Sequence, residues 1–300
     1  MLQHYDERNA DLLVNINGEL LHRDVAGISP FDSAVQGGDA VWEGLRVYEG
    51  RIFRLQEHLD RLRRSAEALS FETIPEDAFI IDQLRRTLAA NGMRDGVHVR
   101  LTLTRGVKIT SGMDPRLNQS GPTLIVLAEF KAPVYDTNGL TLATSSLRRF
   151  PPHMLNQNIH SCNILQSILA KIEATARGAD DALMLDENGC LAETNATHVF
   201  IVKGGVVMTS RTTSCPEGVT RSVVLEICAS EEIRHEVRDI TLEEVHGADE
   251  VFCTGTMGEL AGVTCVDDRM IGDGGIGTMT KQLSGMYMDR TSREGQQVID

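Results

Sequence analysis

A turn-rich segment from Lys131 to Gly139 separates two blocks of strand and helix patterns, and this division constrains the fold more than any other feature. The segment combines proline, aspartate, asparagine and glycine between two apolar stretches, which favours a connection over a regular element. With 300 residues the chain is long enough for two modest domains with apolar cores. We therefore predict a small domain over residues 1–131, a connection over 132–139 and a larger domain over 140–300.

The N-terminal block has the pattern of an α+β domain with a mostly antiparallel sheet. Apolar and polar residues alternate over 12–21 around Asn17-Gly18, the strongest short hairpin signal. Apolar spacing predicts helices over 57–69 and 75–90 and strands over 97–104 and 123–127.

The C-terminal block has the pattern of a larger α/β domain. One predicted helix, over 161–176, carries an aliphatic stripe that we expect to be buried in the core. The stripe consists of Ile164, Leu165, Ile168, Leu169 and Ile172. Further helices are predicted over 220–229 and 279–287, and strands over 140–145, 182–185, 199–202, 206–209 and 251–254.

Composition excludes several classes of protein. A net charge of −14 argues against a nucleic-acid binder, and isolated arginine pairs such as Arg148–Arg149 are expected on solvated faces. Six cysteines without C-x-x-C spacing indicate neither a zinc site nor a disulfide framework, so no bound metal is expected. A reducing cytoplasm suits these cysteines best, and the lack of a leader and of long apolar runs predicts no membrane attachment.

Three short motifs are suited to binding an anion. Gly218-Val219-Thr220 leads directly into a predicted helix, whose N-terminal N–H groups attract negative charge. Thr254-Gly255-Thr256-Met257 follows an apolar strand with two hydroxyls, and Arg61 begins an amphipathic helix where a guanidinium can clamp a phosphate. Each also has a simpler explanation, respectively an N-capped turn, a strand-to-loop turn and an exposed arginine.

Together and in this order, the motifs of the chain resemble the class IV aminotransferases, which are fold type IV pyridoxal-phosphate proteins. This family includes branched-chain and D-amino-acid transaminases and aminodeoxychorismate lyase. The similarity covers nearly the whole chain and rests on seven motifs: Asn17-Gly18-Glu19, Gly38 to Gly44, Phe53 to Leu62, Thr104-Arg105-Gly106, Glu193-Thr194-Asn195, Gly218 to Arg221 and Phe252 to Thr256.

The resemblance implies a two-domain fold type IV structure, a homodimer and an amino acid or 2-oxo acid substrate. Branched-chain transamination with 2-oxoglutarate is the nearest activity, with pyridoxal 5'-phosphate or pyridoxamine 5'-phosphate as a non-covalent cofactor. Glu193 would pair with the pyridine nitrogen, the alternative being a solvated carboxylate. The phosphate would be held by Arg61, Gly218, Val219, Thr220 and Thr256, and the substrate pocket would be lined by Trp42, Arg100, Arg105 and Met257.

One position departs from the family in a way that affects the chemistry. The family keeps its Schiff-base lysine two or three residues ahead of an asparagine and an aromatic residue, and here His160 occupies that position before Asn163. Imidazole forms no stable Schiff base, but its pKa near ~6.5 suits proton transfer. His160 is therefore either a general base or a structural histidine, and Lys108 is the lysine best placed to substitute unless it is a solvated surface residue.

Further departures leave three functions open. Trp42 is larger than the usual phenylalanine or tyrosine, His198 stands where asparagine is usual, and Cys215 belongs to an unusual stretch before Gly218. The first function is an aminotransferase-like enzyme. The second is a lysine-independent enzyme of the same fold, with lyase-like, racemase-like or cofactor-free chemistry at His160, and the third is a catalytically silent cofactor-binding homologue.

Overall fold

The computed structural model describes residues 4–133, 135 and 138–300, which divide into two compact units. The N-terminal unit contains residues 4–132 together with Ile159–Asn163 and Thr291–Asp300, and the C-terminal unit contains the remaining described residues up to Arg290. The predicted domain boundaries assigned both short segments to the larger domain. The predicted connection over 132–139 falls partly on positions 134, 136 and 137, outside the described residues.

The N-terminal unit is built on a seven-stranded sheet in the order β16-β4-β3-β5-β6-β1-β2, with antiparallel neighbours throughout. Its strands are β1 (Leu13–Ile16), β2 (Glu19–His22), β3 (Ala40–Tyr48), β4 (Arg51–Ile52), β5 (Val97–Thr104), β6 (Thr123–Phe130) and β16 (Gln296–Gln297). Its helices are α1 (Ser33–Gly37), α2 (Leu55–Ala68) and α3 (Asp77–Ala90).

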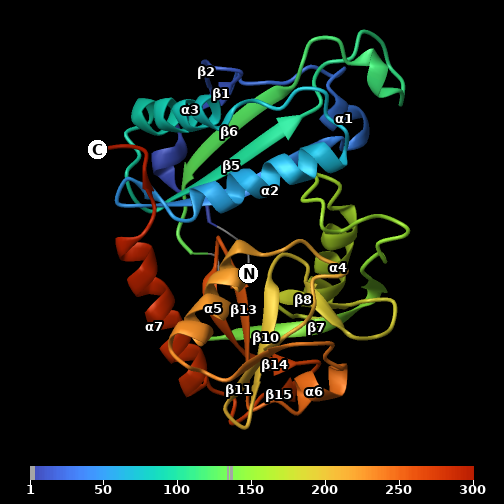
Figure 1. Cartoon of the computed structure of the whole chain (residues 1–300), viewed down its shortest axis with the longest axis vertical. Coiled ribbons are helices and arrows are strands. Elements are labelled where there is room, and N and C mark those ends of the chain that lie inside the picture. The colour runs from blue at the N-terminus through green and yellow to red at the C-terminus, as the bar shows by residue number, and fades with distance from the viewer. Residues whose placement is uncertain (1–3, 134, 136–137) are drawn as a thin grey trace. The chain divides into compact units, whose positions relative to one another are not determined.

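Apolar and polar side chains alternate along the central strands, so the two faces of this sheet differ in polarity. Val41 and Leu45 of β3 and Val99 and Leu101 of β5 point to one face, where α2 and α3 complete a single apolar core (Figure 1). Because successive strand residues point to opposite faces, the intervening positions form a second, more polar face. That second face carries Trp42, Arg46, His98 and Arg100.

The C-terminal unit contains a mixed sheet in the order β12-β11-β10-β13-β14-β7-β8-β9, with β15 paired to β14. Three of its strand pairs are parallel: β14–β7, β7–β8 and β11–β12. Its strands are β7 (Leu140–Arg148), β8 (Asp181–Leu185), β9 (Leu191–Thr194), β10 (His198–Lys203), β11 (Val206–Thr209), β12 (His235–Val237), β13 (Glu250–Gly255), β14 (Glu259–Val266) and β15 (Arg269–Met270). Its helices are α4 (Leu165–Ala176), α5 (Val219–Ser230), α6 (Leu242–His246) and α7 (Thr278–Arg293) (Figure 1). None of the helices formed by described residues is long and apolar enough to cross a membrane.

The aliphatic stripe of α4 corrects the prediction that it is buried. Leu165 is 61% exposed and Ile172 is 59% exposed, and Ile164, Ile168 and Leu169 are also exposed. The helix instead packs through Ala170 and Ala174, whose small side chains allow close approach to the sheet. The larger side chains therefore project away from the core of this unit.

Candidate active site

His160 is held in the N-terminal unit by backbone pairing with β3. The Trp42 N–H donates to the His160 carbonyl at 3.0 Å, and the Cys162 N–H donates to the Ala40 carbonyl at 2.8 Å. The His160 N–H donates to Ser65 Oγ of α2 at 3.1 Å. Hydrogen bonds to β3 and α2 therefore fix the backbone at His160, the position where the family has its lysine.

A buried carboxylate, Glu43, organises the side chains around His160. Arg61 donates to Glu43 through Nε at 2.8 Å and Nη2 at 2.7 Å. The Nδ1 atoms of His58 and His160 approach the two carboxylate oxygens at 2.6 Å and 3.3 Å. Burial alone would raise the pKa of the Glu43 carboxyl, but the charge of Arg61 and the hydrogen bonds from Arg61 and His160 hold that pKa well below its usual range.

The ionised carboxylate determines which ring nitrogen of His160 carries the proton. A carboxylate only accepts hydrogen bonds, so Nδ1 of a neutral His160 must be the donor and Nε2 keeps its lone pair. Burial, reinforced by the Arg61 charge, lowers the pKa of His160 despite the opposing effect of Glu43. His160 is thus arranged as a neutral imidazole able to accept a proton at Nε2.

Trp42 stacks on the same imidazole, and Arg100 in turn lies over Trp42. The Trp42 and His160 rings are stacked with centroids 4.3 Å apart and an interplanar angle of 30°. The Arg100 guanidinium carbon lies 3.5 Å from the centre of the Trp42 ring, and Nη2 donates weakly to Cys162 Sγ at 3.9 Å. Burial lowers the pKa of Arg100. Two residues expected in the substrate pocket therefore lie next to His160.

Three other predicted site residues have partners that serve the fold. Arg61 is bound to Glu43 as described, so its proposed phosphate contact stays a prediction. Arg105 donates to Asp39 at 2.6 Å and 3.1 Å and to the carbonyls of Leu69 and Ser70, and its substrate contact stays a prediction. Lys108 is buried, and its ammonium donates to the Gly112 carbonyl of its own loop at 2.5 Å, so the solvated-surface interpretation is wrong.

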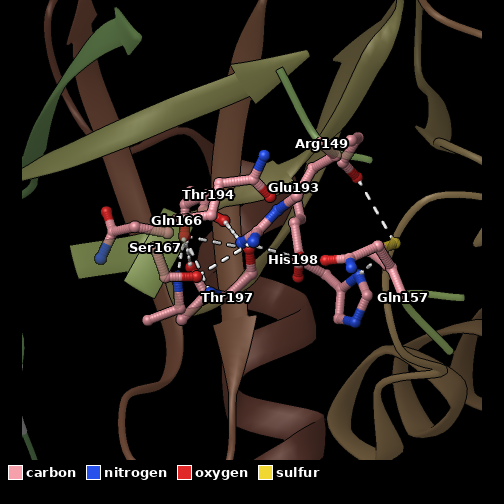
Figure 2. A network of polar contacts seen from close by, with 12 residues as sticks. Arg149, Gln157, Gln166, Ser167, Glu193, Thr194, Thr197 and His198 are labelled. Carbon is pink, nitrogen blue, oxygen red and sulfur yellow. Dashed lines mark hydrogen bonds and ion pairs between the residues drawn. The ribbon is translucent and has the colours of Figure 1, made fainter. Parts of the chain in front are cut away.

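In the C-terminal unit Glu193 is buried on β9 and paired with Arg149 at 3.0 Å, so it is not the solvated carboxylate of the alternative interpretation. Arg149 also donates to the Thr194 carbonyl and to Ser167 Oγ, each at 3.0 Å (Figure 2). The sequence prediction placed Arg149 on a solvated face and missed this role. Only the three-dimensional arrangement identifies Arg149, because it lies far from Glu193 in the sequence.

The N-terminus of α5, where an anion site is predicted, lies next to His198. Gly218 is its N-cap, and a Cβ there would come within 2.2 Å of the His198 ring, so only glycine fits. The first helical hydrogen bond of α5 runs from the Ser222 N–H to the Gly218 carbonyl. The N–H groups of residues 219–221 precede it and take no part in the hydrogen-bond ladder of the helix. On β13 the buried Thr254 hydroxyl has no hydrogen-bond partner among the described residues, and half-buried Thr256 and Met257 follow it.

Comparison with known proteins identifies a matching family and several relatives of this chain. The family model described as Amino-transferase class IV matches residues 40–266. Branched-chain-amino-acid aminotransferase-like protein 1 of Arabidopsis thaliana is 50% identical over 288 residues, covering 96% of this chain. The chain spans only 52% of that relative. The putative branched-chain-amino-acid aminotransferase of Methanocaldococcus jannaschii is 37% identical over 96% of this chain and 99% of its own length.

A solved structure shares the fold. The T.th. branched-chain amino acid aminotransferase, complexed with N-(5'-phosphopyridoxyl)-L-glutamate, matches with a TM-score of 0.87 and 32% sequence identity. The match covers 94% of each chain. The prediction of a two-domain fold type IV structure is confirmed by this similarity.

Proposed function

Because this chain belongs to the class IV aminotransferase family, we propose that it binds pyridoxal 5'-phosphate or pyridoxamine 5'-phosphate non-covalently and acts on small amino acids and 2-oxo acids. Branched-chain amino acids with 2-oxoglutarate are the proposed substrates, in keeping with the names of its relatives. The observation that carries the proposal is the buried Glu193–Arg149 pair in the same unit as the N-terminal N–H groups of α5. A cytoplasmic location suits its six free cysteines.

The residues present fit such a cofactor. Val219 and Thr220 begin a twelve-residue helix, where a phosphate gains hydrogen bonds from backbone N–H groups. The unpartnered Thr254 hydroxyl is a buried polar atom that a ligand would satisfy. Glu193 would face the pyridine nitrogen, and Thr256 would contribute to phosphate binding. When bound, the ring supplies an electron sink for the charge left on the substrate α-carbon.

Proton transfer is the role we assign to His160. Its Nδ1 proton is directed at Glu43, so Nε2 would accept a proton from the substrate α-carbon and return it in a later step. Glu43 would stabilise the imidazolium formed in this way, and Arg61 would keep Glu43 ionised. The same imidazole also supports a lyase-like or racemase-like reaction, because both begin with removal of the α-proton.

A homodimer is the proposed assembly. The aliphatic stripe of α4 supports it, because five large aliphatic side chains on one helix face are exposed in the single chain. Contiguous exposed apolar surface of this kind marks an interaction site in soluble proteins.

The test is a single-turnover experiment with the purified chain and pyridoxamine 5'-phosphate. Adding branched-chain 2-oxo acids or 2-oxoglutarate should produce pyridoxal 5'-phosphate and the matching amino acid. The His160→Ala variant should bind the cofactor with unchanged affinity but react at least ~100-fold more slowly. His235→Ala is the matched control, because His235 is an exposed histidine of β12.

Each outcome of this experiment has a separate meaning. Cofactor binding without turnover for any acceptor would support the catalytically silent homologue, and the transaminase proposal would be abandoned. Exchange of the α-proton of an added branched-chain amino acid with solvent, without amino transfer, would favour the lyase-like or racemase-like reaction. Unchanged turnover in His160→Ala would remove His160 from the mechanism.

A further inference from the structure

The Glu43 carboxylate binds a second histidine, His58, in addition to His160. Nδ1 of His58 lies 2.6 Å from Oε2 of Glu43, whereas Nδ1 of His160 lies 3.3 Å from Oε1. His58 is 2% exposed and Glu43 is 0% exposed. The contact between Glu43 and His58 is therefore the shorter of the two and is shielded from water.

The spacing of polar residues along α2 places His58 at this carboxylate. His58, Arg61 and Ser65 are three and then four residues apart, so their side chains lie on one face of the helix, and all three are buried. His58 and Arg61 contact Glu43 of β3, and Ser65 Oγ accepts the His160 N–H at 3.1 Å. One helix face thus fixes both Glu43 and the backbone of the residue that Glu43 binds.

Hydrogen bonds occupy every acceptor site of the Glu43 carboxylate. A carboxylate has about four lone-pair sites on its two oxygens. Oε1 accepts from Arg61 Nε and His160 Nδ1, and Oε2 accepts from Arg61 Nη2 and His58 Nδ1. Paired bonds from one guanidinium set the plane of the carboxylate, and His58 fills the remaining site on Oε2. If His58 did not fill that site, the His160 contact, which is the longest of the four, would be the first to be lost.

The direction of these hydrogen bonds excludes a proton relay from His160 to His58. Because the ionised carboxylate only accepts hydrogen bonds, Nδ1 is the donor in both imidazoles. Glu43 would have to pass a proton to a nitrogen of His58 that already carries one. The contribution of His58 is therefore its effect on the orientation of Glu43.

We propose that His58 is a positioning residue, which holds Glu43 in the orientation that keeps the His160 proton on Nδ1 and leaves the Nε2 lone pair available. This inference rests on the proposed function, in which His160 Nε2 accepts the α-proton, and extends it to a residue that acts through Glu43. A base held in a single tautomer is ready to accept a proton, whereas the other tautomer has a proton on Nε2 and cannot.

The experiment measures the ring tautomer of His160 by nitrogen-15 NMR. It uses the whole chain without cofactor, labelled at the histidine ring nitrogens, and His160→Ala assigns the signals. Near pH 7 the unsubstituted chain should show the Nδ1–H tautomer. His58→Leu removes the donor while keeping much of the side-chain volume, and should shift His160 toward the Nε2–H tautomer. His58→Asn, whose amide nitrogen can replace Nδ1 as a donor, should restore the original tautomer.

Single-turnover kinetics give a second measurement. His58→Leu should lower the rate by up to ~100-fold with cofactor affinity unchanged, because a misplaced base costs rate and not binding. His58→Asn should recover most of the rate. His22→Leu, at a partly exposed histidine of β2 in the same unit, is the matched control and should change neither the tautomer nor the rate.

Circular dichroism and the thermal midpoint establish that each variant is folded, and His58→Ala replaces His58→Leu if the latter is not. The proposal is overturned if His160 of the unsubstituted chain carries its proton on Nε2, or if it keeps the Nδ1–H tautomer in the folded His58→Leu or His58→Ala variant. The tautomer is measured without cofactor or substrate, so its result is separate from that of the aminotransferase test.

Discussion

The His160 imidazole is stacked on the Trp42 indole with ring centroids 4.3 Å apart, so the two substitutions nearest the expected reaction centre contact each other. Trp42→Phe should weaken this stack, because the smaller ring offers less overlap. Aromatic pairs contribute about 0.5–1.5 kcal/mol beyond burial, so we expect a rate reduced up to ~10-fold with cofactor affinity unchanged. Single-turnover kinetics measure this, and a Trp42→Phe rate equal to that of the unsubstituted chain would show that the stack does not position His160.

The pH profile of the reaction should report His160. Burial lowers its pKa from the ordinary value of 6.5, so the neutral base predominates at pH 7 and is lost as pH falls through that lowered pKa. The rate should therefore be constant near neutrality and decline only below pH 6.5. The residual rate of His160→Ala should not show this decline at acidic pH. If the decline is unchanged in the variant, another group causes it.

Removing Arg149 should destabilise the fold. Arg149→Met leaves Glu193 buried without its cation, which typically costs about 3–5 kcal/mol. Urea unfolding of the cofactor-free chain measures the loss. Arg211→Met is the control, since Arg211 and its partner Asp239 are both mostly exposed and their pair should be worth less than about 1 kcal/mol. Equal effects of the two substitutions would contradict the importance given to the buried pair.

Stability should depend on pH through His98. Burial, with the nearby charges of Lys131, Arg100 and Arg46, lowers its pKa from 6.5 to about 3. Between these values the unfolded chain binds a proton that the folded chain does not, so the free energy of unfolding falls as pH drops below 6.5. At pH 5 the loss from this one group is about 2 kcal/mol. His98→Leu should make the decline shallower in urea titrations at pH 7 and pH 5, whereas His235→Leu should not.

A charge in the α4 stripe should separate the proposed dimer. Ile168→Glu places a carboxylate among exposed aliphatic side chains, which would be desolvated in an interface. Sedimentation or light scattering should show a dimer for the unsubstituted chain and a monomer for Ile168→Glu. Val237→Glu, at an exposed apolar position of β12, should leave the mass unchanged. If the unsubstituted chain is a monomer, the homodimer is ruled out.

Local patterns predicted much of the fold and part of the site. Helical spacing identified α2 and α3 closely, and the Gly218-Thr220 motif does begin α5. Periodicity showed that α4 has an apolar face, but not whether that face meets the core. The apolar face of α4 does not meet the core, because the small side chains of Ala170 and Ala174 on the other side of the helix pack against the sheet.

The missed features depend on contacts between distant residues. The spacing of the cysteines did not indicate that Cys215 lies beside Glu193 and His198, which come together because β9, β10 and the loop before α5 converge in the fold. Arg149 was missed for the same reason. Sequence motifs reveal such a cluster only when its members are close along the chain or follow a known spacing.

The route of the chain limits how this protein can be divided experimentally. Residues Ile159–Asn163 and Thr291–Asp300 belong to the N-terminal unit although the intervening chain belongs to the other. A gene fragment ending near residue 132 would therefore lack β16, one of the two strand partners of β4, and the segment that bears the proposed base. Independent expression of the two halves would require circular permutation or grafted segments, and a simple truncation would report on an incomplete sheet.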